Sequence, residues 1–129
     1  MILFDTDICI DLLRGNANIL RRREQYEEGI GISFMTVAEL YYGAEKSPNP
    51  QDNGRAVEQL LLTLDIVQSD IQILKRFGIL KAYLYQQHLP LADADVFIAA
   101  TTLEKATRLI TGNSKHFERI PGLVLENWR

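Results

Sequence analysis

Three acidic residues lie at the edges of apolar runs, where an ionised carboxylate is energetically unfavourable. Asp5 follows the apolar run Ile2–Phe4. Asp95 precedes the run 96–100, and Glu39 lies within a third apolar stretch. An ionised carboxylate in an apolar setting is costly unless it is paired or bound to a metal. These residues therefore predict a cluster of acids that the fold gathers around a cation.

A cluster of this kind suits a hard divalent cation. Mg²⁺ prefers oxygen ligands, and such an ion can lower the pKa of bound water. Three carboxylates about 4 Å apart repel one another by roughly 4 kcal/mol per pair at an effective dielectric near 20. The sum approaches the stability of an entire fold, roughly 5–15 kcal/mol. Without a cation, such a cluster would have to take up protons or move apart.

The elements that must carry these acids alternate between short strands and helices. Strand patterns cover 2–4, 30–33, 66–67, 108–111 and 123–125, and helical patterns cover 7–14, 19–28, 36–46, 55–64, 70–87 and 93–105. Such alternation favours a parallel sheet with helices on both faces. The predicted fold class is α/β, a three-layer α/β/α sandwich with a central, mainly parallel sheet.

The expected site lies at one edge of this sheet. In open sheets of this type, ligands bind beyond the carboxyl ends of the strands. Asp5 directly follows the first predicted strand, and Thr111 and Asn113 close the fourth. We therefore expect these two strand ends to face one crevice. Glu39 and Asp95 must be brought there by their helices.

Length and composition place further bounds on the chain. Its 129 residues predict a single domain over 1–129, and 47% hydrophobic with 24% charged residues is ordinary for a globular protein. The net charge of −3 argues weakly against non-specific nucleic-acid binding. Cys9 is the single cysteine, which fits a reducing cytoplasm. With no signal peptide and no apolar run near 20 residues, we expect a cytoplasmic protein without a membrane span.

Each acid also has a purely structural interpretation. Thr36 and Glu39 have the spacing of a capping box. An Asp after a short strand, such as Asp5, is often a turn or cap residue, and Asp95 lies in a first helical turn, where the macrodipole favours a carboxylate. Asp93 could be the N-cap of the same helix. His88 and His116 lack partners at zinc spacing and receive no role.

Four segments, in order and with normal spacing, resemble the successive motifs of PIN-domain ribonucleases, and within that group the VapC toxins of bacterial toxin–antitoxin pairs. The segments are LFDTD at 3–7, ISFMTVAELYYGAEKS at 32–47, DVFIAA at 95–100 and LITGNSKHF at 109–117. The ending IPGLVLENW at 120–128 is also similar. The resemblance covers nearly the whole chain and implies a PIN-like fold.

The resemblance also implies roles for particular residues. Asp5, Glu39 and Asp95 match the acids that hold Mg²⁺, for which Mn²⁺ can substitute. Asn113 falls where many relatives carry a fourth acid, so a second tightly held metal is not expected. Supporting positions are the hydroxyl of Thr6, the extra acid Asp93, and Thr111.

The implied activity is that of a metal-dependent endoribonuclease toxin. It would hydrolyse phosphodiester bonds in single-stranded or looped RNA, leaving a 5′-phosphate and a 3′-hydroxyl. The implied partners are a cognate VapB-like antitoxin, which blocks the site, and a second copy in a homodimer. We expect the antitoxin to place an Arg or Lys near Asp5 and Asp95. Its apolar segment would lie along helices 36–46 and 55–64, near Tyr41 and Tyr42.

Two other functions remain open. The Asp-x-Asp of Asp5 and Asp7 also resembles the nucleophile motif of haloacid-dehalogenase-like phosphotransferases. That family needs a later lysine and a paired acid motif after a strand, whereas Asp93 and Asp95 open a predicted helix. The third possibility is a non-catalytic PIN-like binding module. Its mark would be the loss of an acid, and the three main positions are intact.

Overall fold

The computed structural model describes all 129 residues, and strands and helices alternate along the chain as predicted. The elements are β1 (Ile2–Phe4), α1 (Thr6–Leu13), α2 (Ala17–Glu24), β2 (Ile30–Ser33), α3 (Phe34–Glu45), α4 (Pro50–Leu61), β3 (Asp65–Val67), α5 (Ile71–Gln86), α6 (Asp93–Lys105), β4 (Leu109–Ile110), α7 (Ser114–Phe117) and β5 (Leu125–Glu126).

Five parallel strands form one sheet in the order β3-β2-β1-β4-β5. In the register, Leu3 of β1 lies opposite Gly31 of β2 on one side and Leu109 of β4 on the other. The chain builds the sheet in one direction from β1 to β3 and then returns to add β4 and β5 on the other side. The boundary between β1 and β4 is therefore the switch point, where open α/β sheets form a crevice.

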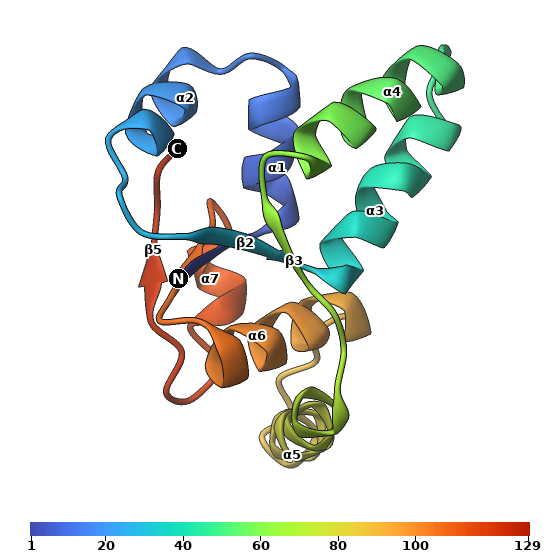
Figure 1. Ribbon diagram of the computed structural model, residues 1–129. Coiled ribbons are helices and arrows are strands. Elements are labelled where there is room, and N and C mark those ends of the chain that lie inside the picture. Colours follow the sequence, from blue (N-terminus) through green and yellow to red (C-terminus); the bar gives the residue numbers. More distant parts are fainter.

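Helices cover both faces of the sheet, and each face has its own apolar core. Side chains alternate along β1, so Ile2 and Phe4 enter one core and Leu3 enters the other. The first core lies under α1 to α4, and the second lies under α5, α6 and α7. Figure 1 shows these helices on opposite sides of the sheet. The predicted three-layer α/β/α sandwich is confirmed.

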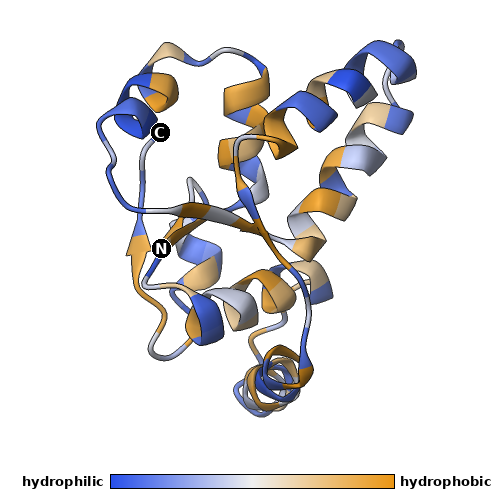
Figure 2. Ribbon diagram, viewed as in Figure 1, coloured by the Kyte–Doolittle hydropathy of each residue, from blue (hydrophilic) through white to orange (hydrophobic).

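The longest helix, α5, lies at the outer edge of the second layer. Asp70 caps it, with Oδ1 accepting a hydrogen bond from Ile73 N at 2.9 Å. Ile73, Leu80 and Leu84 are buried. Figure 2 shows how apolar and polar positions alternate around α5 and α6, as expected for helices with one buried face. No helix of the chain is long and apolar enough to cross a membrane.

The beginning of α3 differs from the prediction. Ser33, the last residue of β2, is the N-cap, and its Oγ accepts a hydrogen bond from Met35 N at 3.0 Å. Thr36 is buried within the helix. The capping-box interpretation of Thr36 and Glu39 is therefore wrong, because the helix begins before Thr36.

Other boundaries shift for local reasons. α4 begins at Pro50 rather than at 55, since proline suits a first helical position, where its missing N–H is not needed. α2 ends at Glu24 rather than at 28, and β5 covers Leu125–Glu126 rather than 123–125. The four-residue helix α7 was not predicted, because one turn carries no periodic pattern.

Candidate active site

The ends of the two central strands meet at the switch point. Asp5 follows β1 and donates its backbone N–H to Ile110 O at 2.9 Å. Thr111 follows β4, and its hydroxyl donates to Asp5 Oδ2 at 2.8 Å. Both residues are buried. The predicted meeting of these two strand ends is thus observed, and Thr111 contacts Asp5 directly.

Asp5 carries a buried carboxylate that accepts hydrogen bonds from neutral donors only. These are the Thr111 hydroxyl and the backbone N–H of Thr6, at 2.8 Å each. Burial raises the pKa of Asp5 to about 7, and the negative charges of Asp7 and Asp95 add to this increase. The site therefore disfavours the ionised carboxylate until a positive charge arrives.

Asp95 lies in the first turn of α6 and within electrostatic reach of Asp5. Its own pKa is raised by partial burial, and nearby His116 opposes that increase. His116 Nδ1 is 3.6 Å from Asp95 Oδ2. α6 lies on the face of the sheet opposite to α1, so the fold brings Asp95 toward Asp5 from that face.

Glu39 is connected to this region through a hydroxyl. Thr6 Oγ1 donates to Glu39 Oε1 at 2.8 Å and lies 3.0 Å from Thr36 Oγ1. Thr6 directly follows Asp5 in the chain. Glu39 is therefore connected to the residue next to the buried carboxylate, not to Asp5 itself. The supporting position assigned to Thr6 has a clear geometric counterpart in this contact.

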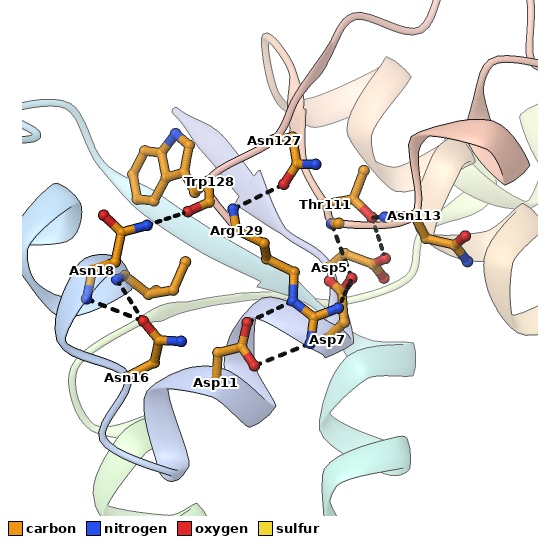
Figure 3. Close-up of polar contacts among 12 residues, drawn as sticks. Asp5, Asp7, Asp11, Asn16, Asn18, Thr111, Asn113, Asn127, Trp128 and Arg129 are labelled. Atoms are coloured by element: carbon orange, nitrogen blue, oxygen red, sulfur yellow. Dashed lines mark hydrogen bonds and ion pairs between the residues drawn. The ribbon is translucent and has the colours of Figure 1, made fainter.

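Asn113 reaches the site with its backbone rather than with its side chain. Its N–H donates to Thr111 Oγ1 at 2.9 Å. Its side-chain Nδ2 lies 2.9 Å from His116 Nδ1. In Figure 3 the Asn113 side chain points away from Asp5. In this arrangement the backbone N–H of Asn113 supports the Thr111 hydroxyl, and its side chain contacts His116 instead.

Asp93 lies apart from the other acids. Its carboxylate is 59% exposed and pairs with Lys81 Nζ at 2.8 Å. It does not cap α6 either, because the helix begins at Asp93 itself and Ala92 occupies the N-cap position. We find no contact that joins Asp93 to Asp5 or Asp95, so the structure gives it no visible part in the cluster.

Four residues at this edge of the sheet were given no role in the predicted metal site. Asp7 and Asp11, one turn apart on α1, pair with the distant Arg129, and His116 lies beside Asp95. The i, i+4 spacing of the two aspartates was the only local signal. Their partner lies more than 100 positions away, so no local pattern could have indicated the contact.

The donor set fits a divalent cation held by few protein ligands. Asp7 Oδ1 is buried without a hydrogen-bond partner, and no cationic side chain pairs with Asp5. No three acidic, histidine or cysteine side chains are gathered closely enough to hold an ion among themselves, so the predicted three-acid cluster of Asp5, Glu39 and Asp95 is not formed in this structure. Mg²⁺ is commonly held by one or two carboxylates together with water and substrate phosphate. Asp5 and Asp95 satisfy that requirement.

Comparison with known proteins decides the family. The sequence pattern of the PIN domain matches residues 2–123. This chain belongs to the PIN-domain family. It is 37% identical to ribonuclease VapC2 of Haemophilus influenzae, over 98% of this chain and 96% of that protein. It is 32% identical to the tRNA(fMet)-specific endonuclease VapC of Shigella flexneri, over the same shares.

The PIN fold is shared with solved structures. The crystal structure of VapBC2 from Rickettsia felis, bound to a DNA fragment from its promoter, contains a chain that matches with a TM-score of 0.93. The identity is 32%, and the match covers 100% of both chains. Membership of the PIN family removes the haloacid-dehalogenase-like alternative, which rested on one short motif.

Proposed function

We propose that this PIN-domain protein is a metal-dependent endoribonuclease and the toxin of a toxin–antitoxin pair, acting in the cytoplasm. The observation that carries the proposal is the buried Asp5 carboxylate, which lies at the switch point within electrostatic reach of Asp95 and has no cationic partner. The ribonuclease names of relatives that align over nearly the whole chain support the same activity. Cys9, the single cysteine, is buried and forms no disulfide, which agrees with a reducing compartment.

Asp5 and Asp95 would hold Mg²⁺, and Mn²⁺ could replace it. The bound ion would lower the pKa of a water and neutralise charge on the RNA phosphodiester. Thr111 and the Thr6 N–H fix the orientation of Asp5 through their hydrogen bonds. Glu39, held by the Thr6 hydroxyl, adds negative charge at the rim and can orient water there. The other side of Asp95 is bordered by His116.

Cleavage of RNA by the purified full chain tests this proposal. With Mg²⁺ and a pool of RNAs rich in loops, the wild type should cut, and a chelator should stop it. Asp5→Asn or Asp95→Asn should each lower the rate at least about 100-fold, because removing even an outer-sphere partner of a metal costs about 10–100-fold. The exposed Asp52→Asn, which breaks only a surface pair with Arg55, is the matched control. Full activity in either acid variant would defeat the assignment.

A groove next to the acids offers a place for the antitoxin. It has a volume of about 580 Å³ and lies between α1, α3 and α4. Thr6 and Glu39 line it, together with Leu40, Tyr42 and Val57. We propose that a VapB-like antitoxin lays an apolar segment in this groove. Its Arg or Lys would then reach Asp5 and Asp95, since a guanidinium pairs with carboxylates and stays charged.

We expect a small antitoxin-like reading frame directly upstream of the gene, and co-expression with it tests this model. The complex should be inactive on RNA and regain activity when the partner is removed. Tyr42→Glu should weaken the complex while the free protein still cleaves RNA, because Tyr42 is 66% exposed and lines the groove. Leu62→Glu, at an exposed position outside the groove, is the control. A partner that binds without reducing cleavage would contradict blocking of the site.

We also propose a homodimer, which the family resemblance implies. The outer face of α5 supports it, because Ile71, Leu74 and Tyr85 are exposed there. These residues lie on one helical stripe together with Gly78, where a second helix could approach closely. Sedimentation should show a dimer that Leu74→Glu dissociates and Leu62→Glu does not. A monomeric wild type would overturn this proposal.

A further inference from the structure

A second set of contacts at the crevice surrounds the side chain of Arg129. Its Nε and NH2 donate to the two carboxylate oxygens of Asp11, at 2.7 and 3.1 Å. Its NH1 lies 3.4 Å from Asp7 Oδ2. Figure 3 shows the guanidinium between the two aspartates of α1. Asp11 is buried, so this two-pronged pair is the charge compensation that lets it remain there.

The same oxygen of Asp7 also holds the loop after β4. Asp7 Oδ2 accepts a hydrogen bond from Gly112 N at 2.9 Å. The residue before Gly112 is Thr111, whose hydroxyl donates to Asp5, and the residue after it is Asn113. A continuous series of contacts therefore runs from Arg129 through Asp7 and the 111–113 loop to the buried carboxylate of Asp5.

Gly112 shows how closely the arginine packs on this loop. A Cβ added to Gly112 would collide with Cδ of Arg129 and would lie 3.0 Å from Asp7 Oδ2. The loop, the aspartate and the arginine thus fill one small space. A shift of the guanidinium would leave room for Gly112 to move, and Thr111 with it.

The backbone that carries Arg129 is itself fixed. Trp128 is buried against Phe4, with 5.2 Å between the ring centroids. Asn18 Nδ2 donates to Trp128 O at 2.8 Å, and Arg129 N donates to Asn127 Oδ1 at 2.8 Å. The guanidinium therefore stands on an anchored segment, as a positioning group requires.

We propose that Arg129 is a positioning residue of the active site, which fixes Asp7 and through it the 111–113 loop so that Thr111 holds Asp5 ready for the cation. This inference rests on the proposed metal-dependent cleavage for its consequence. Arginine suits the task because its planar fork engages Asp11 with two donors and leaves the third nitrogen for Asp7. The alternative, that Arg129 binds an RNA phosphate directly, makes a different kinetic prediction.

The test compares Arg129→Ala with Arg129→Lys, and with Arg22→Ala as the matched control. Arg22 also contacts the anchored segment, through Asn127 O at 3.2 Å, but it has no contact with Asp7 or Asp11. We expect Arg129→Ala to lower kcat for RNA about 10–100-fold and to weaken Mn²⁺ binding by a similar factor, with KM little changed. Arg129→Lys should recover only part of both, because lysine lacks the fork. Arg22→Ala should retain both values.

A second pair of variants keeps the proposal testable if Arg129→Ala does not fold. Asp7→Asn retains an oxygen that can accept from Gly112 N, whereas Asp7→Ala does not. We expect Asp7→Asn to keep more activity and Mn²⁺ affinity than Asp7→Ala. Faster hydrogen exchange of the Gly112 N–H in Asp7→Ala and in Arg129→Ala would report the loosened loop directly.

Several outcomes would overturn the proposal. One is an Arg129→Ala protein with the kcat and Mn²⁺ affinity of Arg22→Ala. Another is a rise in KM alone with Mn²⁺ binding intact, which would indicate direct contact with RNA. A wild type that binds no Mn²⁺ would also overturn it. A wild type that binds Mn²⁺ but does not cut RNA would defeat the proposed function instead, and the Mn²⁺ titrations would still decide the role of Arg129.

Discussion

Two pairs of carboxylates lie at the same edge of the sheet and differ in what compensates their charge. Asp7 and Asp11 share the guanidinium of Arg129, which contacts Asp11 at 2.7 Å. Asp5 has only hydroxyl and amide donors, and Asp95 has only the edge of His116. The first pair is supplied with a cation by the chain itself, and the second pair is not.

This difference separates a structural role from a chemical one. Asp11 is satisfied, because both of its carboxylate oxygens accept from Arg129. Asp7 is only partly compensated: its Oδ2 accepts from Gly112 N and faces Arg129, but its Oδ1 has no partner and burial still raises its pKa. A buried acid without a cationic partner has a raised pKa, as Asp5 does, and its charged form gains most from a cation that arrives from outside. Such perturbed acids concentrate at functional sites.

The largest effect concerns the stability of Asp5→Asn without metal. The folded protein holds the Asp5 proton more tightly than the unfolded chain, whose pKa is near 3.8. Ionising Asp5 in the folded protein therefore costs stability. This cost is absent below about pH 4 and grows as the pH rises toward 7, to on the order of 4 kcal/mol. Asparagine avoids it, and its Oδ1 can still accept from Thr6 N, but its amide nitrogen cannot accept the hydrogen bond from the Thr111 hydroxyl, worth about 1 kcal/mol.

Urea unfolding of the metal-free proteins measures this effect. At about pH 8 the variant should be more stable than the wild type by about 2–3 kcal/mol, and the gap should narrow at about pH 5. Asp52→Asn should follow the wild type at both values. If the free energy of unfolding had the same pH dependence in Asp5→Asn and in the wild type, Asp5 would not be the acid with the raised pKa.

The second prediction concerns Glu39. Glutamine can still accept the hydrogen bond from Thr6, so Glu39→Gln should unfold at nearly the wild-type urea concentration. Removing the charge should lower the rate of RNA cleavage about 10–100-fold, the usual cost of altering a partner near a metal. Parallel turnover and unfolding measurements decide the matter. Near-normal turnover would leave Glu39 with the role of a structural acceptor for Thr6.

Asn113 should have a smaller effect of opposite sign. An amide oxygen carries no charge and binds a hard cation less strongly than a carboxylate. Asn113→Asp should tighten Mn²⁺ binding only several-fold, because its side chain points away from Asp5 toward His116 and the added charge acts on the ion from a distance. Calorimetry should also show one well-held ion in the wild type. Two comparable tight sites there would contradict this interpretation.

The smallest expected effect belongs to Asp93, which lies on the same helix as Asp95. Its carboxylate is exposed and paired with Lys81, and such surface pairs contribute about 0–1 kcal/mol. Asp93→Asn should therefore change both the cleavage rate and the melting temperature very little. A loss approaching that of Asp95→Asn would mean that Asp93 joins the cluster when substrate binds.

The sequence predicted the parts of the molecule that follow from local periodicity. Strand and helix alternation indicated the parallel sheet, and the rule that sites lie beyond the strand ends predicted that Asp5 and Thr111 would meet. The prediction for the beginning of α3 was wrong, because Ser33 and Thr36 are both good caps and the pattern could not choose between them. Because β2 ends at Ser33, that residue is the N-cap and α3 begins directly after it.

The contacts across long sequence separations could not be predicted. Nothing near Asp7 or Asp11 in the sequence points to Arg129, which lies 118 positions beyond Asp11. His116 looked isolated because its neighbours in the fold, Asp95 and Asn113, do not form a spaced ligand motif. Asp93 was predicted as a supporting residue of the site because it lies two positions before Asp95. Its side chain leaves the helix in another direction, toward Lys81.

Titration of the metal-free protein with Mn²⁺ in a calorimeter, at neutral pH, shows whether the uncompensated pair, Asp5 and Asp95, receives its cation from outside. The wild type and Asp52→Asn should bind one ion with the same affinity, and Asp5→Asn should show no saturable binding in the same range. Binding of Mn²⁺ by Asp5→Asn as tight as by the wild type would contradict the account.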